Sequence, residues 1–441
     1  MRINIPETDQ KRIVIVGGGF AGLNLALKLR RTNYLVVLVD KNNYHQFQPL
    51  FYQVATAGLE PSSIIYPLRK MFQRNKNIYI RVTEVQKIEP KNNRVITPFG
   101  ILNYDYLVLA HGADTNYYGN KNIERNVIPM KSVGEALVLR NILFSDFENA
   151  LTSDDPEEIN ALLNIVIVGG GPTGVEVAGA LAEMKKQIVP KDYPEINADQ
   201  VCIHLIQGAD CLLNGMSDEA SDAALKFLQK LDVKVQLNAR VTDYDGKNLT
   251  LKDGQKIAAK KVVWAAGIKG NFIEGLPNEV IHNGNRLKVN AFHQIEGFEN
   301  IYAIGDIAAM ISEEYPYGHP QVAQVAIQQG KNLASNFKVL LKNKKQRPFH
   351  YKDLGSMATI GRKRAVVDLA YWKFQGAFAW LVWLFIHLLQ LIGFKNRVFV
   401  FINWVWNYLF YDQSLRLIIK SQDHREKWAK EPNKTTESAT N

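Results

Sequence analysis

The sequence predicts an α/β protein with two doubly wound units and an amphipathic helical region near the C-terminal end. Three observations predict this fold class. An apolar strand, a glycine-rich turn and a helix follow one another at residues 12–30, and the same order returns at residues 164–184. Strands that alternate with helices are typical of parallel sheets covered by helices. The third observation is a run of twenty-one residues without a charged side chain, from Phe374 to Phe394.

Length and composition are those of a globular protein. The 441 residues are enough for two or three domains, and 46% hydrophobic with 22% charged residues does not indicate disorder. The N-terminal segment MRINIPETDQKR lacks the apolar run of a secretory signal, so we expect the chain to stay in the cytoplasm if its source is bacterial. Cys202 and Cys211 have neither CxxC nor metal-ligand spacing, so no disulfide framework and no metal site are expected.

The net charge of +10 indicates an acidic partner. Basic residues flank the apolar run at Lys373, Lys395 and Arg397. The other basic groups are Lys342, Lys344, Lys345 and Arg347, and Arg362, Lys363 and Arg364. This distribution favours an anionic lipid surface over nucleic acid, for which only the net charge speaks. A solvated positive face is the commoner meaning of such runs.

The first glycine turn has the spacing of a dinucleotide-binding site. Gly17 permits the tight turn, Gly19 lets the backbone approach a pyrophosphate, and Gly22 allows the helix to pack closely on the strand. The helix N-terminus offers unpaired N–H groups to the anion. The next strand ends at Asp40, about twenty residues on, where a carboxylate can accept hydrogen bonds from ribose hydroxyls. The further residues expected at this site are Phe20, Ala21 and Lys41.

The second glycine turn repeats the same arrangement. Gly169, Gly171 and Gly174 take the same roles, and the later strand ends at Gln207 instead of an acid. Pro172 and Thr173, between the glycines, are expected to line the same site. An acid at the strand end favours an unphosphorylated ribose and repels a 2′-phosphate. Gln207 removes that repulsion, which leaves the choice between NADH and NADPH open.

Three further strands end in small residues. Residues 300–310 run into Gly305 and Asp306, and such a strand-end aspartate lies beside the ribityl chain and pyrophosphate in flavoproteins with two dinucleotide sites. An ordinary strand and turn would have the same pattern. Residues 104–114 and 261–270 are similar to the crossover strands that link two dinucleotide domains. The residues of these segments expected to line a cofactor are Ala110, Gly112, Ala266 and Gly267, with Ala323 further along the chain.

These five segments, in this order, resemble the two-dinucleotide-binding-domain flavoproteins over roughly the first 310 residues. The resemblance implies two Rossmann-like domains, one for FAD and one for NAD(P)H. Glutathione and thioredoxin reductases use a cysteine pair beside the flavin, and sulfide:quinone reductases also need cysteines. Residues 41–69 contain none. Within this stretch, FQPLFYQVATAGL is similar to a segment of the type II NADH dehydrogenases, which are NADH:quinone oxidoreductases that pump no protons.

Residues 320–330 resemble the AQxAxQ quinone motif of that family. Gln324 and Gln328 lie four apart on one helical face, and the resemblance implies that both amides donate hydrogen bonds to a quinone. Without the resemblance, a polar helix face is the commoner meaning of such a pair. Gln48, in the loop expected beside the flavin edge, is a candidate to line the route from flavin to quinone. The family implies that Glu176 orients the nicotinamide or relays protons. A carboxylate in a first helical turn is otherwise explained by the helix dipole.

The resemblance therefore implies a membrane-associated enzyme that oxidises NADH through FAD and reduces a membrane quinone without pumping protons. Two rivals are a soluble FAD-dependent NAD(P)H reductase with another acceptor and a flavin-bearing sensor that does not turn over. The quinone is not identified by the sequence, and a homodimer is expected from the family. The expected regions are an FAD domain at 1–118 and 273–365, whose second part contains the quinone-site helix, an NAD(P)H domain at 119–272, membrane-binding helices at 366–420 and a hydrophilic tail at 421–441.

The apolar run, with the segment after it, resembles the membrane-binding end of the same family. Twenty-one residues at about 1.5 Å each reach roughly 31 Å, enough to cross a membrane. Helical spacing instead favours a helix lying in the interface, because it groups Gln375, Gly376, Ala379, His387, Gln390 and Gly393 opposite Leu381, Leu384, Leu388 and Ile392. A second polar stripe contains Asn396, Asn403, Asn407 and Ser414. We expect two interfacial helices on the cytoplasmic side of the inner membrane, with the polar stripes facing the protein.

Overall fold

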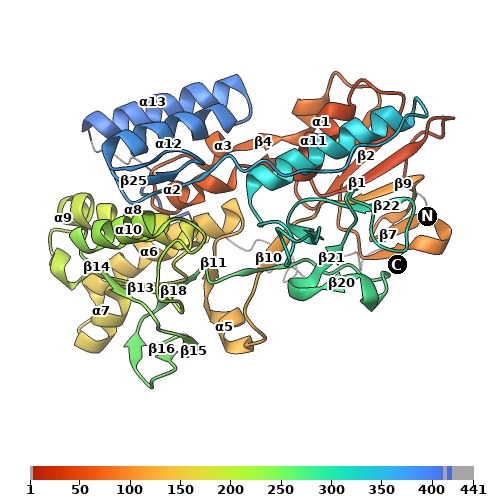
Figure 1. Cartoon of the computed structure of the whole chain (residues 1–441). Helices are drawn as coiled ribbons and strands as arrows, with labels where there is room; N and C mark the ends of the chain where they lie inside the picture. The colour runs from red at the N-terminus through yellow and green to blue at the C-terminus, as the bar shows by residue number, and fades with distance from the viewer. Residues whose placement is uncertain (1–2, 411–414, 420–441) are drawn as a thin grey trace, which may run out of the picture.

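Two five-stranded parallel sheets form the two halves of the molecule (Figure 1). The computed structural model describes residues 3–410 and 415–419. The first sheet has the order β22 (Ile301–Ala303), β9 (Tyr106–Leu109), β1 (Arg12–Val16), β2 (Leu35–Asp40) and β5 (Ile78–Val82). The second has the order β11 (Ile128–Pro129), β18 (Lys261–Trp264), β12 (Asn164–Val168), β13 (Cys202–Ile206) and β14 (Val233–Gln236). Each glycine turn follows a central strand, β1 or β12.

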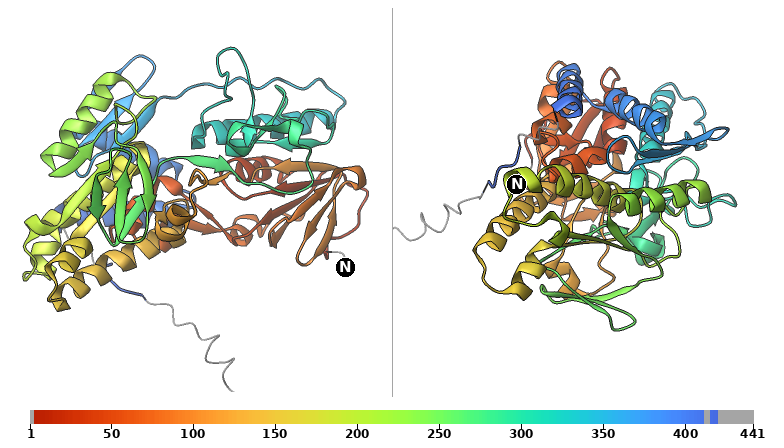
Figure 2. Two further views of the ribbon diagram at one scale, coloured as in Figure 1. Left: turned by 90° about the horizontal axis from the view of Figure 1, so that it is seen from below. Right: turned by 90° about the vertical axis from the view of Figure 1, so that its left-hand side faces the viewer.

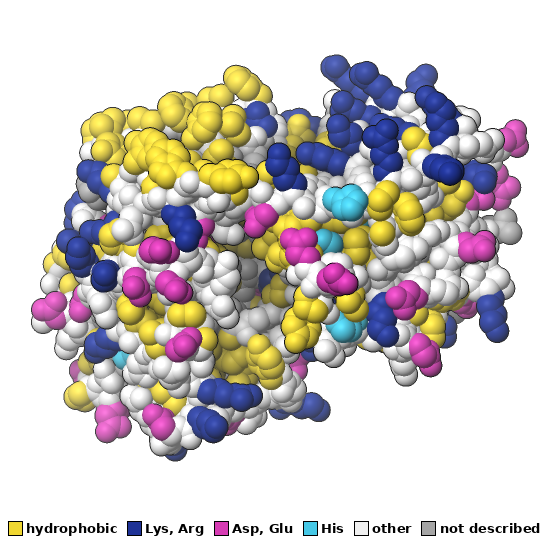
Figure 3. Space-filling model, in the orientation of Figure 1, with side chains coloured by type: hydrophobic (Ala, Val, Ile, Leu, Met, Phe, Trp, Pro, Cys, Tyr) yellow, Lys and Arg dark blue, Asp and Glu magenta, His cyan; other side chains and the backbone are white. Residues whose placement is uncertain are grey.

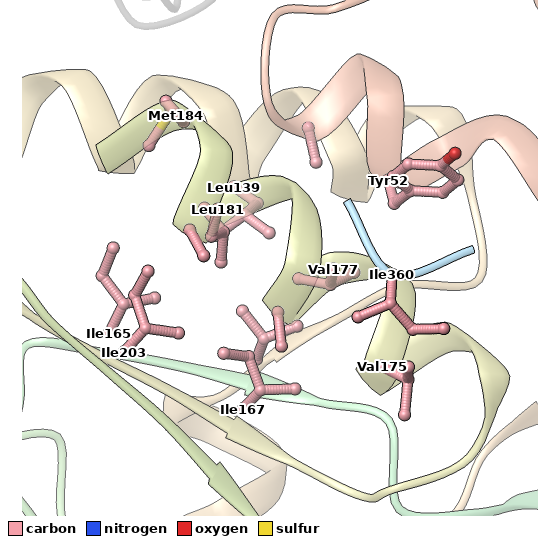
Figure 4. Close-up of a cluster of buried hydrophobic side chains, with 14 of the residues drawn as sticks. Tyr52, Leu139, Ile165, Ile167, Val175, Val177, Leu181, Met184, Ile203 and Ile360 are labelled. Carbon is pink, nitrogen blue, oxygen red and sulfur yellow. The ribbon is translucent and has the colours of Figure 1, made fainter. Parts of the chain in front are cut away.

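The central strands are buried on both faces, which explains their unbroken apolar sequences. In β1, Ile13 and Ile15 face the cluster that includes residues of helices α1 and α11, whereas Val14 and Val16 face a separate cluster on the other side. In β12, Ile165 packs on the face covered by helix α8. Figure 4 shows that this cluster also receives side chains from outside the half that contains β12, among them Tyr52 and Ile360.

The helices lie on the faces of the sheets and along one edge of the molecule. Their bounds are α1 (Phe20–Leu29), α2 (Phe51–Ala55), α3 (Pro61–Ile64), α4 (Leu68–Phe72), α5 (Lys121–Asn126), α6 (Val133–Thr152), α7 (Pro156–Leu163), α8 (Pro172–Gln187), α9 (Val189–Asp192), α10 (Asp218–Lys230), α11 (Ala323–Leu340), α12 (Ala377–Gln390) and α13 (Phe394–Phe410). Helices α1 and α8, which follow the glycine turns, are both expected from the sequence pattern.

Small sheets complete the two halves. They are β3 (Tyr44–Gln46) with β4 (Ile65–Pro67), β6 (Lys87–Glu89) with β7 (Arg94–Thr97) and β8 (Gly100–Asn103), β15 (Val241–Tyr244) with β16 (Asn248–Leu251) and β17 (Lys256–Ala258), and β20 (Ile281–His282) with β21 (Arg286–Lys288) and β23 (Ala308–Ala309). The two crossovers pair as antiparallel strands, β10 (Ala113–Thr115) with β19 (Ile268–Gly270).

The C-terminal region begins with an antiparallel sheet of β24 (Ser356–Thr359), β25 (Ala365–Asp368) and β26 (Lys373–Gln375). Helices α12 and α13 follow and lie along one edge of the molecule (Figure 2). Among the described residues, no helix meets the length and hydropathy that a membrane span requires. Residue Ser414 and the predicted hydrophilic tail at 421–441 lie outside the described residues.

The interpretation of residues 374–394 as one long helix is wrong. Phe374 and Gln375 belong to β26, Gly376 has a φ of +91°, and the helix contains only the fourteen residues of α12. Leu391 then has extended dihedral angles, φ −60° and ψ 141°, and ends it. Fourteen residues cover about 21 Å, less than the roughly 30 Å of a hydrocarbon core.

The predicted faces of α12 are partly correct. Ala379 and His387 face the protein, but Gln390 and, before the helix, Gln375 are exposed, and the largest fully buried side chain on this helix is Trp383. Leu384, Leu388 and Ile392, expected on the lipid side, are half-buried against the core. Trp383, which the helical spacing placed on neither face, packs in the core and takes most of the contact with the protein.

The polar stripe of α13 faces the protein as expected. Asn396 donates a hydrogen bond to the Ile65 carbonyl at 2.9 Å, and Asn407 donates to the Gly58 carbonyl at 3.0 Å and to Asn403 at 2.9 Å. These amides satisfy backbone groups of the loops around α3 and leave the apolar face of α13 on the surface.

Candidate functional site

The first glycine turn is shaped by close backbone contacts. Gly17 has a φ of +106°, and a Cβ there would lie 2.4 Å from the Ala110 carbonyl oxygen. A Cβ at Gly22 would lie 2.0 Å from the Gly17 carbonyl oxygen. Neither position accepts a side chain, whereas Gly19, just before Phe20 at the start of α1, faces open space. The turn therefore offers a helix N-terminus with room for a pyrophosphate.

Asp40 closes the first turn with its carboxylate. Oδ2 accepts a hydrogen bond from the Gly18 N–H at 2.6 Å, and Oδ1 accepts one from the Asn42 N–H at 2.7 Å. Burial raises the pKa of Asp40, and these two N–H groups and the neighbouring Lys41 partly lower it. The carboxylate lies where a ribose is expected. Its bond to Gly18 is a role that the sequence pattern did not suggest.

The second turn repeats this geometry in detail. Gly169 has a φ of +113°, and a Cβ there would lie 2.4 Å from the Ala265 carbonyl oxygen. A Cβ at Gly174 would lie 1.8 Å from the Gly169 carbonyl oxygen, and Gly171 faces open space. Pro172 and Thr173 form the exposed first turn of α8. Gln207 accepts a hydrogen bond from the Gly170 N–H at 2.9 Å and donates one to the Cys211 carbonyl at 3.1 Å.

The crossover segments place small residues against both turns. Ala110 follows β9 and is buried beside Gly17, while Ala266 follows β18. Gly112 and Gly267 both have positive φ, +72° and +124°, at the exits of these strands. His111, which the sequence pattern did not single out, directly precedes Gly112 and is half-buried. Its Nε2 bonds to the Asn271 carbonyl at 3.0 Å and its Nδ1 has no partner among the described residues.

Gly305, which follows β22, contacts residues of both α1 and α11. The Gly305 N–H donates to the side-chain oxygen of Gln329 at 2.6 Å, and the space beside Gly305 is bounded by Ala21. Burial raises the pKa of Asp306, and the cations Lys131 and Arg286 partly lower it. Ala323 is the first residue of α11. Gln329 is a fully buried amide that sequence reasoning missed, although it directly follows Gln328.

The two predicted quinone-site glutamines contact the backbone of an extended segment, residues 347–355. Gln324 donates to the Gly355 carbonyl at 3.0 Å and accepts from the Leu354 N–H at 3.1 Å. Gln328 donates to the Lys352 carbonyl at 2.8 Å and accepts from the N–H of the same residue at 3.1 Å. Their contact with a quinone stays a prediction.

The same helical face continues this pattern. Asn336 donates to the Arg347 carbonyl and accepts from the Arg347 N–H, both at 2.9 Å. Asn332 adds a longer bond, 3.5 Å, to the Pro348 carbonyl. We call the four side chains at this four-residue spacing, Gln324, Gln328, Asn332 and Asn336, the amide ladder. The ladder ties α11 to the segment that leads into β24.

Glu176 is buried where three parts of the chain meet. It lies on α8 with 8% of its surface exposed, and its Oε1 accepts a bond from the Thr359 N–H of β24 at 3.4 Å. Burial raises its pKa to about 8, and the Thr359 N–H lowers it in part. The buried indole of Trp383 lies near the same carboxylate, outside strict hydrogen-bond geometry, and also lowers this pKa. Burial raises the pKa of the Tyr52 hydroxyl, and the nearby Glu176 raises it further.

An aromatic series connects this carboxylate with the first turn. Trp383 stacks on His387 at 3.9 Å between ring centres, His387 contacts Phe47 at 6.3 Å, and Phe47 contacts Phe20 at 5.9 Å. Gln48, next to Phe47, is exposed at the start of a short 3-10 helix (Gln48–Leu50). Of the predicted catalytic residues, the structure thus brings Glu176 to the aromatic series and Gln48 to its edge. Gln324 and Gln328 lie on a separate helix.

A large apolar face remains exposed on α12 and α13 (Figure 3). Its main members are Phe378, Leu381, Phe385, Leu389, Phe399, Phe401, Ile402, Trp406 and Leu409. The opposite side is held by polar bonds, including one of 2.7 Å from the Trp404 indole N–H to Gln53. Exposed apolar patches of this extent mark interaction surfaces.

Comparison with protein families and known proteins agrees with this arrangement. Residues 11–330 match the pyridine nucleotide-disulphide oxidoreductase family, and residues 354–411 match the NDH2 C-terminal domain. A type II NADH:quinone oxidoreductase of Mycobacterium tuberculosis is 35% identical over 418 residues, which cover 90% of this chain and 88% of the relative. An internal alternative NAD(P)H-ubiquinone oxidoreductase of Arabidopsis thaliana is 29% identical and covers 92% of this chain and 85% of the relative.

The fold is shared with solved structures. NDH2 from Plasmodium falciparum in complex with NADH superposes with a TM-score of 0.85 at 22% identity, over 93% of this chain and 100% of that one. A sulfide:quinone oxidoreductase from Aquifex aeolicus gives 0.71 at 19% identity, over 91% and 96%. With two glycine turns, two parallel sheets and the apolar C-terminal helices in the same order, this chain belongs to the type II NADH:quinone oxidoreductases within the pyridine nucleotide-disulphide oxidoreductase family.

Proposed function

We propose that the chain oxidises NADH and reduces a quinone dissolved in a membrane, with FAD as its cofactor and without pumping protons. The observation that supports this most directly is the burial of Glu176 at one junction. There the helix of the second glycine turn meets Tyr52, which follows the first turn, and Trp383 of the apolar C-terminal region. Donor, cofactor and membrane regions thus share one buried group.

The residues present fit two dinucleotides. Gly19 and Gly171 each leave open space at a helix N-terminus, where a pyrophosphate binds favourably. His45 beside the first turn and His111 at the crossover each have a buried ring nitrogen without a partner among the described residues, as expected of groups that face a ligand. The first site would hold FAD through the Gly17 turn, Asp40 and Asp306, and the second would hold NADH through the Gly169 turn. FAD supplies the two-electron chemistry between NADH and quinone.

Glu176 can hold or release a proton at this junction. With a pKa of about 8, its carboxyl group is mostly protonated at neutral pH. Trp383 and Tyr52 cover it, and the Tyr52 hydroxyl accepts a bond from Gln53, which in turn binds Trp404. The side chains around Glu176 therefore exclude water and provide polar contacts that lead towards α13.

Membrane attachment is the second part of the proposal. The apolar face of α12 and α13 would enter one leaflet of a bilayer, with anionic lipid favoured by the net charge of +10. We place the enzyme on the cytoplasmic side of the inner membrane, as expected from the sequence, and as a homodimer, which the family resemblance implies. The division into regions at 118, 272, 365 and 420 belongs to the same proposal.

One purification tests the proposal. The full chain, extracted from membranes in detergent, should show the absorption of bound flavin and oxidise NADH continuously when a water-soluble quinone analogue is added. A single flavin reduction without turnover would favour the sensor. Turnover with a ferredoxin-like protein but not with any quinone would favour the rival reductase.

A further inference from the structure

A basic cleft lies between the end of α1 and the segment after α4. Its volume is about 540 Å³. Five exposed cationic side chains line it, Arg30, Arg31, Lys70, Arg74 and Lys76. The other described residues of its wall are Thr32, Met71, Gln73, Asn75 and Asn77. None of these ten residues is acidic, so the cleft concentrates positive charge.

Hydrogen bonds fix the two walls of this cleft to each other. The Asn77 side chain donates to the carbonyls of Leu29 at 3.1 Å, Thr32 at 3.3 Å and Tyr34 at 3.0 Å. Asn75 adds a bond of 3.4 Å to the Arg30 carbonyl. The backbone that presents the cations is therefore ordered before any ligand arrives, which reduces the entropic cost of binding.

The cleft is joined to the apolar face through β4 and α4. A Cβ on Gly393, in the turn between α12 and α13, would lie 2.6 Å from the Tyr66 ring. Asn396 of α13 binds the carbonyl of Ile65. The Lys70 ammonium lies 5.8 Å from the centre of the same Tyr66 ring. Tyr66, which contacts the turn between α12 and α13, thus lies only four residues before Lys70, a cation of the cleft.

The positive surface extends beyond the cleft on the same side. Tyr34 donates a hydrogen bond to the Phe337 carbonyl at 2.9 Å, which brings the C-terminal end of α11 beside the segment after α1. Lys338, Lys342, Lys344 and Lys345 are exposed there. Figure 3 shows Lys and Arg side chains gathered over the region of α1 and α11, on the same upper edge as the apolar face of α12 and α13.

We propose that this cleft binds the phosphate of an anionic phospholipid headgroup and so forms a second attachment to the membrane beside α12 and α13. Arginine forks and lysine ammonium groups recognise phosphate oxygens. A bilayer places its phosphates just above the depth reached by interfacial apolar side chains, which is where an adjoining basic cleft would meet them. The inference rests on the membrane attachment given under Proposed function.

Vesicle binding tests this site with two charge-matched variants of the full chain. The first, Lys70→Gln/Arg74→Gln/Lys76→Gln, removes three cations of the cleft. The second, Lys247→Gln/Lys252→Gln/Lys256→Gln, removes three exposed lysines around β16 and β17, on the side of the molecule away from α12 and α13 (Figure 1). Each protein is sedimented with vesicles of phosphatidylcholine alone and of phosphatidylcholine with phosphatidylglycerol, at low and high salt.

The wild type and the β16–β17 variant should bind the anionic vesicles more tightly than the neutral ones. In the cleft variant, the ratio of the affinity for anionic vesicles to that for neutral vesicles should fall by on the order of 100-fold at low salt. Binding to neutral vesicles should be the same for all three. Equal losses in the two variants, or no loss in the cleft variant, would overturn the site. Complete loss of binding to anionic vesicles when inorganic phosphate is added at constant ionic strength would also overturn the site, because it indicates a site for free anions. Complete loss when RNA is added would overturn it too, because it indicates a nucleic-acid surface.

The outcome can be separated from a failure of the proposed function. If the wild type does not bind neutral vesicles, attachment through the apolar face is wrong. If it does not turn over NADH and a soluble quinone analogue in detergent, the proposed reaction is wrong. The cleft is judged only by the difference between anionic and neutral vesicles, which neither result changes.

Discussion

Gln207 occupies in the second half of the molecule the position that Asp40 occupies in the first half. Each side chain accepts a hydrogen bond from the middle glycine of its turn, Gly170 at 2.9 Å and Gly18 at 2.6 Å. The common requirement is an acceptor that closes the turn, and an amide meets it as well as a carboxylate. The difference in charge is therefore free to set which ribose is accepted.

Gln207→Glu should shift the enzyme towards NADH. The carboxylate keeps the bond from Gly170 but repels a 2′-phosphate, and it can no longer donate to the Cys211 carbonyl. We expect the ratio of kcat/KM for NADH to that for NADPH to rise by roughly 10-fold, which corresponds to about 1.4 kcal/mol of repulsion. Steady-state kinetics with both donors measure it. A wild type that already rejects NADPH strongly would contradict the relaxed specificity.

Glu176→Gln should flatten the pH dependence of stability. The folded-state pKa, about 8, exceeds the ordinary 4.5, so the folded chain keeps a proton that the unfolded chain releases. The stability from this proton is complete below pH 4.5 and falls by about 1.4 kcal/mol per pH unit as the pH rises towards 8. Urea unfolding at pH 5.5 and 7.5 should show a drop about 2–3 kcal/mol larger in the wild type.

The same variant tests the chemical role of Glu176. A glutamine fits the space and can accept from the Thr359 N–H, but it cannot release a proton. We expect turnover to fall by about 100-fold or more, in the range of a lost general acid or base. Stopped-flow flavin reduction by NADH, compared with steady-state turnover, shows which half-reaction slows. Full turnover with unchanged NADH affinity would exclude a catalytic role.

The amide ladder permits a direct test of the predicted quinone contact. Gln324→Ala and Gln328→Ala should weaken quinone reduction by about 10-fold or more, while NADH still reduces the flavin at the wild-type rate. Asn336→Ala is the matched control, because it breaks the ladder at its other end. If Asn336→Ala slows quinone reduction equally, the glutamines act by holding residues 347–355. Equal loss of both half-reactions would remove the assignment altogether.

The apolar face can be tested with one charge at a time. Phe385→Glu, on α12 with 60% of its surface exposed, should reduce binding to neutral vesicles by at least 10-fold, because a carboxylate must then enter the interface. Phe99→Glu is the control, since Phe99 is 67% exposed at the turn between β7 and β8. Vesicle sedimentation of both variants decides. Equal binding by the two variants would show that α12 is not the attachment surface.

Much of the fold follows from local signals in the sequence. A Cβ on Gly17, Gly22, Gly169 or Gly174 would lie 2.4 Å or less from a backbone atom, so only glycine fits at these positions. Their spacing therefore predicts both turns and the helices after them. The parallel strands are predicted for a similar reason, because burial on both faces demands an unbroken apolar sequence.

The parts that could not be predicted depend on tertiary contacts. The face of α12 that contacts the protein contains Trp383, which lies against Tyr52 and near Glu176, residues that are far apart in the sequence. The amide ladder is likewise invisible in the pair Gln324 and Gln328, since its partners are backbone atoms of another segment. In the sequence, Asn332 and Asn336 continue the four-residue spacing of Gln324 and Gln328, and this regular spacing is the signal that could have predicted the ladder.

The helix of the second turn also touches the C-terminal sheet directly. A Cβ on Gly179 of α8 would lie 2.5 Å from the backbone nitrogen of Gly361, in the turn between β24 and β25, so this turn and the helix meet without an intervening side chain. The C-terminal region is also bonded to the first half of the molecule, through Trp404 and Asn396. It therefore connects both halves. Under the membrane attachment proposed above, a movement of α8 relative to the first half would also shift the surface that holds the protein on the bilayer.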